Sequence, residues 1–168
     1  MIKEPTKSIE LRFYGTLNDF LRQNRRQKTF EHRYMGSPTV KDLIESVGVP
    51  HVEVTLILVN GMSVTFDFHP QSGDRVSCYP QFHLLDIGQI SLLQNEPSES
   101  RFILDVHLGR LAKYMRLMGF DTLYQTDYSD EEILKKALEE ERIILTCDLG
   151  ILRNGLAKWG YYIRERVS

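Results

Sequence analysis

The chain has 168 residues, a formal net charge of −2 and 42% apolar residues. This apolar content is enough to build hydrophobic cores, which excludes an intrinsically disordered chain, and the length allows one large domain or two small ones. The near-neutral balance excludes a protein that is basic over its whole surface, so any surface for nucleic acid would have to be local.

Nothing in the sequence predicts export or membrane insertion. The N-terminal segment MIKEPTKSIE lacks the apolar stretch of a signal peptide, and no apolar run approaches the roughly 20 residues that a membrane helix needs. The two cysteines, Cys78 and Cys147, lie far apart and share no metal-ligand spacing. We therefore expect a cytoplasmic protein with two free thiols and no membrane partner.

The first half of the sequence has the pattern of a sheet covered by one helix, in the order β-β-α-β-β-β. An apolar stripe in residues 40–47 follows the capping candidates Ser37 and Thr39, and Gly48 is placed to end this helix. The pair Asn60-Gly61 predicts a hairpin turn because both residues tolerate positive φ. The expected strands are residues 8–14, 29–34, 54–59, 63–68 and 75–80.

A polar segment, QNEPSES at residues 94–100, contains a proline and has no periodicity, so it reads as a linker. It predicts two domains, residues 1–95 and residues 96–168.

The second half alternates strand and helix in the order β-α-β-α-β-α-β, which is typical of a parallel α/β sheet. One helix is expected at residues 108–118, a second one capped by Ser129 or Asp130, and a third at residues 151–159. The expected strands are residues 101–104, 122–124, 142–146 and 161–164.

Three aspartates are expected at one edge of this sheet. Asp105 follows the first strand, Asp148 follows the third, and Asp130 stands at the start of the middle helix. Functional residues of parallel sheets gather at the carboxyl ends of the strands. Clustered carboxylates repel one another unless a cation compensates, and Mg²⁺ or Mn²⁺ prefers such oxygen ligands. The three aspartates therefore predict a catalytic metal site for phosphodiester chemistry, although each of them alone could be a cap or a turn residue.

Basic residues recur on the helix that follows Asp105. Arg110, Lys113 and Arg116 lie opposite its apolar face and could contact phosphates of a nucleic acid, or could simply be a solvated helix surface. His107 also lies next to the predicted site.

The block DVHLGRLAKYMRLMGFDT, with the later DEEIL and RIILT-x-D motifs, resembles the Mut-seven C-terminal RNase family, a branch of the PIN-like nucleases. The resemblance implies a PIN-like fold, RNA as the substrate, and metal-dependent phosphodiester hydrolysis. It carries over Asp105 and Asp148, together with Asp130 as the third ligand and Glu131 as the competitor for that position.

The segments TVKDLIESVGVPHVEVTLILVNG and GDRVSCYP are similar to the ubiquitin-like sulfur-carrier proteins. This implies a β-grasp fold for the first domain. Carriers end in a free Gly-Gly, whereas here the chain continues past Tyr79-Pro80 without one. Carrier chemistry is thereby excluded, and binding of a protein partner is the expected role.

Two departures from the family pattern bear on activity. Cys147 stands where the family usually has an arginine, which could remove a phosphate-binding charge. The family usually continues into a zinc ribbon, and this sequence ends at Ser168, so no zinc is expected in it.

The predicted function is therefore an RNA-cleaving hydrolase that uses Mg²⁺ or Mn²⁺. The alternatives are a non-catalytic RNA- or protein-binding protein that keeps the nuclease fold, and a regulatory partner that acts through an edge strand of the first domain. The second domain is small for an independent core, so we expect it to pack on the first domain or to self-associate.

Overall fold

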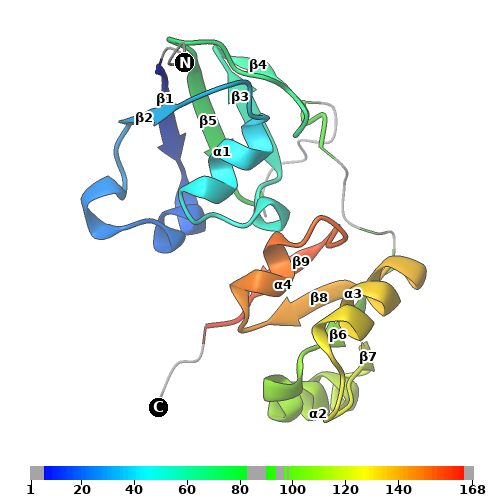
Figure 1. Ribbon diagram of the computed structural model, residues 1–168. Coiled ribbons are helices and arrows are strands. Elements are labelled where there is room, and N and C mark those ends of the chain that lie inside the picture. Colours follow the sequence, from blue (N-terminus) through cyan, green and yellow to red (C-terminus); the bar gives the residue numbers. More distant parts are fainter. Residues whose placement is uncertain (1–5, 83–89, 94–96, 98, 165–168) are drawn as a thin grey trace. The chain divides into compact units, whose positions relative to one another are not determined.

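The computed structural model describes residues 6–82, 90–93, 97 and 99–164. The chain forms two compact units, Met1–Asn95 and Glu96–Ser168. In Figure 1 the first unit runs from blue to green and the second from green to red.

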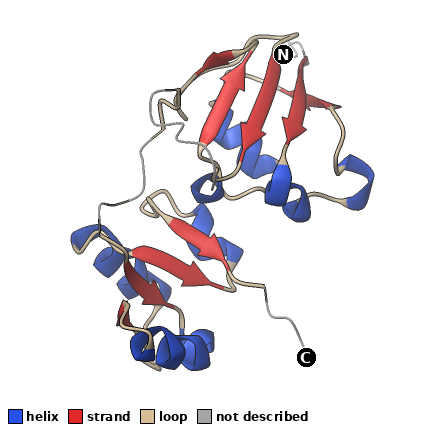
Figure 2. Cartoon of the chain, turned by 180° about the vertical axis from the view of Figure 1, so that it is seen from behind, coloured by secondary structure: helices blue, strands red, loops and turns tan. Residues whose placement is uncertain are grey.

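The first unit is built on a five-stranded sheet in the order β2-β1-β5-β3-β4. β1 and β5 pair in parallel at its centre, and the other pairs are antiparallel. Helix α1 crosses the sheet, as a β-grasp fold requires (Figures 1 and 2). The elements are β1 (Lys7–Phe13), β2 (Phe30–Tyr34), α1 (Val40–Ser46), β3 (Leu56–Val59), β4 (Met62–Ser63) and β5 (Arg75–Tyr79).

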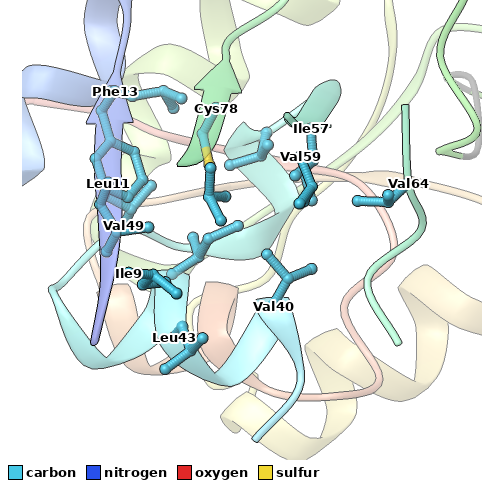
Figure 3. Packing of buried hydrophobic residues seen from close by; sticks show 14 of the residues in the cluster. Ile9, Leu11, Phe13, Val40, Leu43, Val49, Ile57, Val59, Val64 and Cys78 are labelled. Atoms are coloured by element: carbon cyan, nitrogen blue, oxygen red, sulfur yellow. The ribbon is translucent and has the colours of Figure 1, made fainter. Parts of the chain in front are cut away.

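The core of this unit lies between the sheet and α1. Side chains from β1, β3, β5 and α1 point into the same space, as Figure 3 shows for Leu11, Ile57, Cys78 and Val40. All four are fully buried. Burial raises the pKa of the Cys78 thiol, so this cysteine is an unreactive core residue.

Local sequence signals set the helix start and the hairpin of the first unit. Thr39 caps α1 in a reciprocal box with Asp42, and these hydrogen bonds lower the pKa of the Asp42 carboxyl. Asn60 and Gly61 both have positive φ, 50° and 86°, so the predicted tight turn is confirmed.

The expected strand at residues 63–68 is mostly wrong, because β4 ends at Ser63. The chain then turns toward α1, where the carbonyls of Phe66 and Phe68 accept hydrogen bonds from Lys41 N (3.2 Å) and Val40 N (2.7 Å). The first N–H groups of a helix have no partner within it. The alternating segment therefore satisfies the start of α1 instead of extending the sheet.

Within the described residues of the first unit, three 3₁₀ turns were not expected from the sequence: η1 (Gly15–Phe20), η2 (Gln23–Arg25) and η3 (His51–Glu53). Buried Asn18 holds the first of them together. Its amide donates to the carbonyls of Phe13 (3.0 Å) and Gly15 (3.1 Å), and its side-chain oxygen accepts from Gln27 N (2.6 Å).

The second unit confirms the predicted parallel α/β sheet. Four parallel strands lie in the order β7-β6-β8-β9, and helices connect them. The elements are β6 (Arg101–Leu104), η4 (Val106–Leu108), α2 (Gly109–Leu117), β7 (Asp121–Leu123), α3 (Asp130–Glu139), β8 (Ile143–Thr146), α4 (Leu149–Arg153) and β9 (Gly160–Tyr162).

Helix α4 differs from its predicted position at residues 151–159. It begins directly after Asp148 and ends at Arg153, since Asn154 has an extended backbone and its side chain accepts from Leu156 N. The apolar pattern extends beyond Arg153 into a turn, and the spacing of apolar residues alone does not distinguish this turn from a helix.

Every residue of β8 is buried, and so are the last two residues of β6, Ile103 and Leu104. At the amino end of this sheet, buried Arg142 donates to Asp121 (2.7 Å), Glu140 (2.7 Å) and the Phe102 carbonyl (3.2 Å). These bonds tie β6, β7 and β8 together at the edge opposite the predicted site. No helix in the described part of the chain is long and apolar enough to cross a membrane.

Candidate active site

The candidate site lies where β6 and β8 end. The two strands pair in parallel, Leu104 beside Leu145, and the N–H of Asp105 donates to the Leu145 carbonyl (3.1 Å). The residues that follow the two strands, Asp105 and Cys147-Asp148, therefore meet at one edge of the sheet, as the sequence predicted for Asp105 and Asp148.

Asp105 is a buried carboxylate, 3% exposed, that is held by three hydrogen bonds. Its Oδ1 accepts from His107 N (2.8 Å), and its Oδ2 accepts from Cys147 N (2.8 Å) and from the Thr146 hydroxyl. Two of these donors are backbone N–H groups, so the carboxylate is oriented by the chain itself. Oδ1 keeps room for a further ligand, whereas Oδ2 is saturated.

Thr146 connects the two aspartates. It is fully buried, its hydroxyl donates to Asp105, and the same oxygen accepts from Asp148 N (2.8 Å). Thr146 is not among the site residues predicted from the sequence. The signal was a threonine at the end of a buried apolar strand, two residues before a predicted site aspartate.

Asp148 caps α4. Its Oδ1 accepts from Gly150 N (2.6 Å), and its side chain is exposed. A carboxylate in this position has one oxygen committed to the helix start and the other directed to solvent or a ligand.

Asp130 lies in the first turn of α3 and is exposed, as is its neighbour Glu131. Of the two capping candidates, Ser129 is the cap: its hydroxyl accepts from Glu132 N (3.3 Å), and its N–H donates to the Glu132 carboxylate (2.8 Å). Neither Asp130 nor Glu131 hydrogen-bonds Asp105 or Asp148 among the described residues. The structure thus joins two of the three predicted aspartates through Thr146 and leaves the third outside that network.

The donor set fits Mg²⁺ or Mn²⁺ in a limited way. Within the described ranges, no group of three or more His, Cys, Asp or Glu side chains is arranged to hold a metal ion. Asp105 nevertheless keeps one acceptor position on Oδ1, which accepts from His107 N alone, and Asp148 keeps its Oδ2, since only its Oδ1 accepts from Gly150 N. Mg²⁺ is commonly bound by one or two carboxylates, with water and substrate phosphates completing the shell.

The three predicted phosphate-binding cations of α2 have different surroundings. Arg110 and Lys113 are exposed. The guanidinium of Arg116 instead donates to the carbonyls of Thr122 (3.0 Å) and Tyr124 (3.3 Å), so it anchors the chain around β7.

Gly109, the first residue of α2, is required by a close approach. A Cβ atom at this position would lie 2.6 Å from the Tyr124 hydroxyl, which itself donates to the Val106 carbonyl (3.1 Å). Tyr124 thus holds the turn between Asp105 and α2, and a larger residue at position 109 would force the Tyr124 ring to shift away from the Val106 carbonyl.

Cys147 is half-buried, and its side chain packs against the apolar cluster of this unit. Its contribution to the site is the backbone N–H that Asp105 accepts. The position that carries an arginine in the family pattern still orients the aspartate through its main chain, whatever its side chain.

The two units define a class of protein: a β-grasp, ubiquitin-like domain followed by an α/β domain of the PIN-like kind. Residues 6–86 match the family described as Mut7-C ubiquitin, and residues 100–168 match the family described as Mut7-C RNAse domain. The first unit is therefore similar to Mut7-C ubiquitin domains, and the second unit is similar to Mut7-C RNAse domains.

Two crystal structures are similar to part of the chain, and no curated protein matches it. One is SAMP1 from Haloferax volcanii, with 20% identity over 45% of this chain and 97% of that one, at a TM-score of 0.36. The other is the H. volcanii small archaeal modifier protein 1, with 19% identity over 45% of this chain and 99% of that one, also at 0.36.

Proposed function

We propose that the chain is a cytoplasmic, metal-dependent ribonuclease whose second unit hydrolyses RNA phosphodiester bonds. One observation carries the proposal: Asp105 is a buried carboxylate, fixed by three donors and linked through Thr146 to Asp148, in a unit that matches an RNAse domain family. A site that is oriented before substrate arrives is what catalysis by positioned charge requires.

Asp105 and Asp148 are the residues that would hold Mg²⁺ or Mn²⁺. Such an ion, when bound, supplies an activated water and neutralises charge on the phosphodiester. Asp105 keeps its orientation because two main-chain N–H groups hold it, while exposed Asp148 adapts to substrate. Asp130 remains the proposed third ligand, with Glu131 as its alternative.

We assign the first unit a binding role. Its chain runs on past Tyr79-Pro80 into further residues, so it has no free carboxyl group there for carrier chemistry. A protein partner that docks on this unit would then bring the nuclease unit to its RNA.

The proposal is tested with a labelled RNA oligonucleotide and the full chain. We expect cleavage with Mg²⁺ or Mn²⁺, none with a chelator, and a rate lowered at least about a hundredfold by Asp105→Asn. Asp148→Asn should lower the rate while keeping the fold, because asparagine caps a helix as well as aspartate does. Asp127→Asn, which changes an exposed loop carboxylate, is the matched control.

The alternative is a non-catalytic RNA- or protein-binding protein that retains the nuclease fold. The observation in its favour is that the described residues contain no group of three or more potential metal ligands. Equal cleavage rates for the wild-type chain and its three Asp→Asn variants would support this alternative. So would the absence of RNA cleavage with both Mg²⁺ and Mn²⁺.

A further inference from the structure

Helix α2 presents an exposed face that mixes cations with an aromatic ring. Arg110, Lys113, Tyr114 and Leu117 are spaced by three or four residues, so they share one side of the helix. Buried Ala112 and Met115 occupy the other side. Tyr114 is 53% exposed and Leu117 is 74% exposed. Arg110, the first residue of this face, follows Asp105 of the candidate site by five positions in the sequence.

The charge of this face is of one sign. The stretch from His107 to Phe120 contains no acidic residue, although the whole chain has a net charge of −2. Arg110 and Lys113 form no ion pair with any residue that the structure describes. Arg116, in contrast, is held by backbone carbonyls. The two free cations therefore make a local basic surface that complements a polyanion.

The exposed ring decides between the possible polyanions. A base can stack on an aromatic side chain only when it is unpaired, because the bases of an RNA duplex are stacked within the helix. Arg110 and Tyr114 lie one turn apart, about 6 Å along the helix axis. This spacing lets a phosphate contact the cation while the attached base reaches the ring.

A second copy of this chain is the less suitable occupant. In a two-fold contact the same surface of both copies would meet, which would bring the Arg110 and Lys113 side chains of one copy against those of the other. Like charges without acidic partners oppose that contact.

From these observations we infer that the exposed face of α2 is a binding surface for single-stranded RNA, with Tyr114 stacking on an unpaired base and Arg110 and Lys113 contacting the flanking phosphates. The inference deepens the proposed ribonuclease function. It rests on that function in one respect, namely that the bound RNA strand runs from α2 toward Asp105.

Binding is measured by fluorescence anisotropy on the full chain in a chelator, so that cleavage does not interfere. The probes are a labelled oligouridylate and an RNA duplex of the same length. We expect tighter binding of the oligouridylate. Tyr114→Ala should weaken that binding about tenfold, whereas Tyr114→Phe, which keeps the ring, should bind as the unchanged chain does.

Salt dependence separates the ring from the cations. Replacing both Arg110 and Lys113 by Gln should lower the slope of log affinity against log salt by about 0.7 for each cation. Tyr114→Ala should leave this slope unchanged. Lys135→Gln is the matched control, because Lys135 is an exposed helix cation of α3 whose side chain is 72% exposed.

Three results would overturn the inference: equal binding by Tyr114→Ala, equal affinity for the duplex, or no oligouridylate binding by the unchanged chain. A change in molar mass of Tyr114→Ala without a change in RNA affinity would show a contact between copies instead. If the wild-type chain binds RNA through α2 but never cleaves it, the ribonuclease proposal is wrong, whereas the assignment of α2 as an RNA-binding surface still holds.

Discussion

A single hydroxyl group holds the candidate site together at the scale of residues. Thr146 donates to Asp105 and accepts from Asp148 N, and it is fully buried. The hydroxyl therefore links the side chain of Asp105 to the main chain of Asp148, in addition to the two main-chain N–H groups that hold Asp105. Loss of this buried hydroxyl should affect function more strongly than stability.

Thr146→Val keeps the volume of the side chain and removes the hydroxyl. We expect the free energy of unfolding to fall by about 1–3 kcal/mol, because Asp105 and the Asp148 N–H lose a buried partner. RNA cleavage at a temperature where the variant is folded should fall at least about tenfold, since Oδ2 of Asp105 loses one of its two donors and the carboxylate is held less firmly. Denaturant unfolding and initial cleavage rates measure the two effects.

Thr146→Ser is the companion variant, because it restores the hydroxyl. It should recover most of the cleavage rate even where it loses stability through the missing methyl group. Equal rates for the valine and serine variants would show that the hydroxyl does not position the site.

At the scale of elements, side-chain caps fix the starts of three helices. Thr39, Ser129 and Asp148 each begin a helix with a side-chain acceptor, and two of them form reciprocal boxes with an acidic residue. Of these three residues, Asp148 is the one that also lies in the candidate site. The start of α3 separates the two roles, because Ser129 is the cap and Asp130 is the site candidate.

Ser129→Ala tests the cap of α3. It should lower the free energy of unfolding by about 1 kcal/mol, as loss of a serine cap does. The Ser129 backbone N–H and its hydroxyl hold the pKa of Glu132 below its ordinary value. Part of that cause is removed, so the pKa should rise, as a carboxyl-detected NMR titration would show.

The sign of the pH dependence follows from this lowered pKa. A carboxyl whose pKa is depressed in the folded state contributes stability above its ordinary pKa, and this contribution is lost as the pH falls through the folded value. The stability difference between the unchanged chain and Ser129→Ala should therefore shrink toward acid pH. A difference that is constant over the acid range would refute the role of Glu132.

At the scale of the whole molecule, each unit has its own sheet and its own apolar cluster. The second unit, Glu96–Ser168, is small for an independent core. It also leaves Met118 and Leu156 largely exposed. A small unit with exposed apolar side chains gains stability when a further surface covers them.

We therefore predict that the chain unfolds in one transition or self-associates in solution. Differential scanning calorimetry and light scattering over a range of concentrations measure the two possibilities. A concentration-independent monomer with two separate unfolding transitions would contradict the prediction, since it would show that the second unit is stable by itself.

The sequence alone determined the features that depend on neighbours along the chain. It predicted the parallel order of the second unit, the Asn60-Gly61 turn, and a helix start near Thr39, because periodicity, positive φ and capping are local. It also placed Asp105 and Asp148 at one edge, because the strands before them are short and apolar and parallel strands end together.

Only the tertiary structure decided what depends on residues distant in sequence. The segment expected as a strand at residues 63–68 instead bends toward α1. Its carbonyls accept hydrogen bonds from the first N–H groups of that helix, which would otherwise have no partner. The guanidinium of Arg116 donates to a backbone carbonyl of β7, and Thr146 donates to Asp105, which lies 41 positions earlier in the sequence. Asp130 stays outside the network of Asp105 and Asp148 for the same reason: periodicity places a residue on an element, whereas the packing of elements decides which side chains meet.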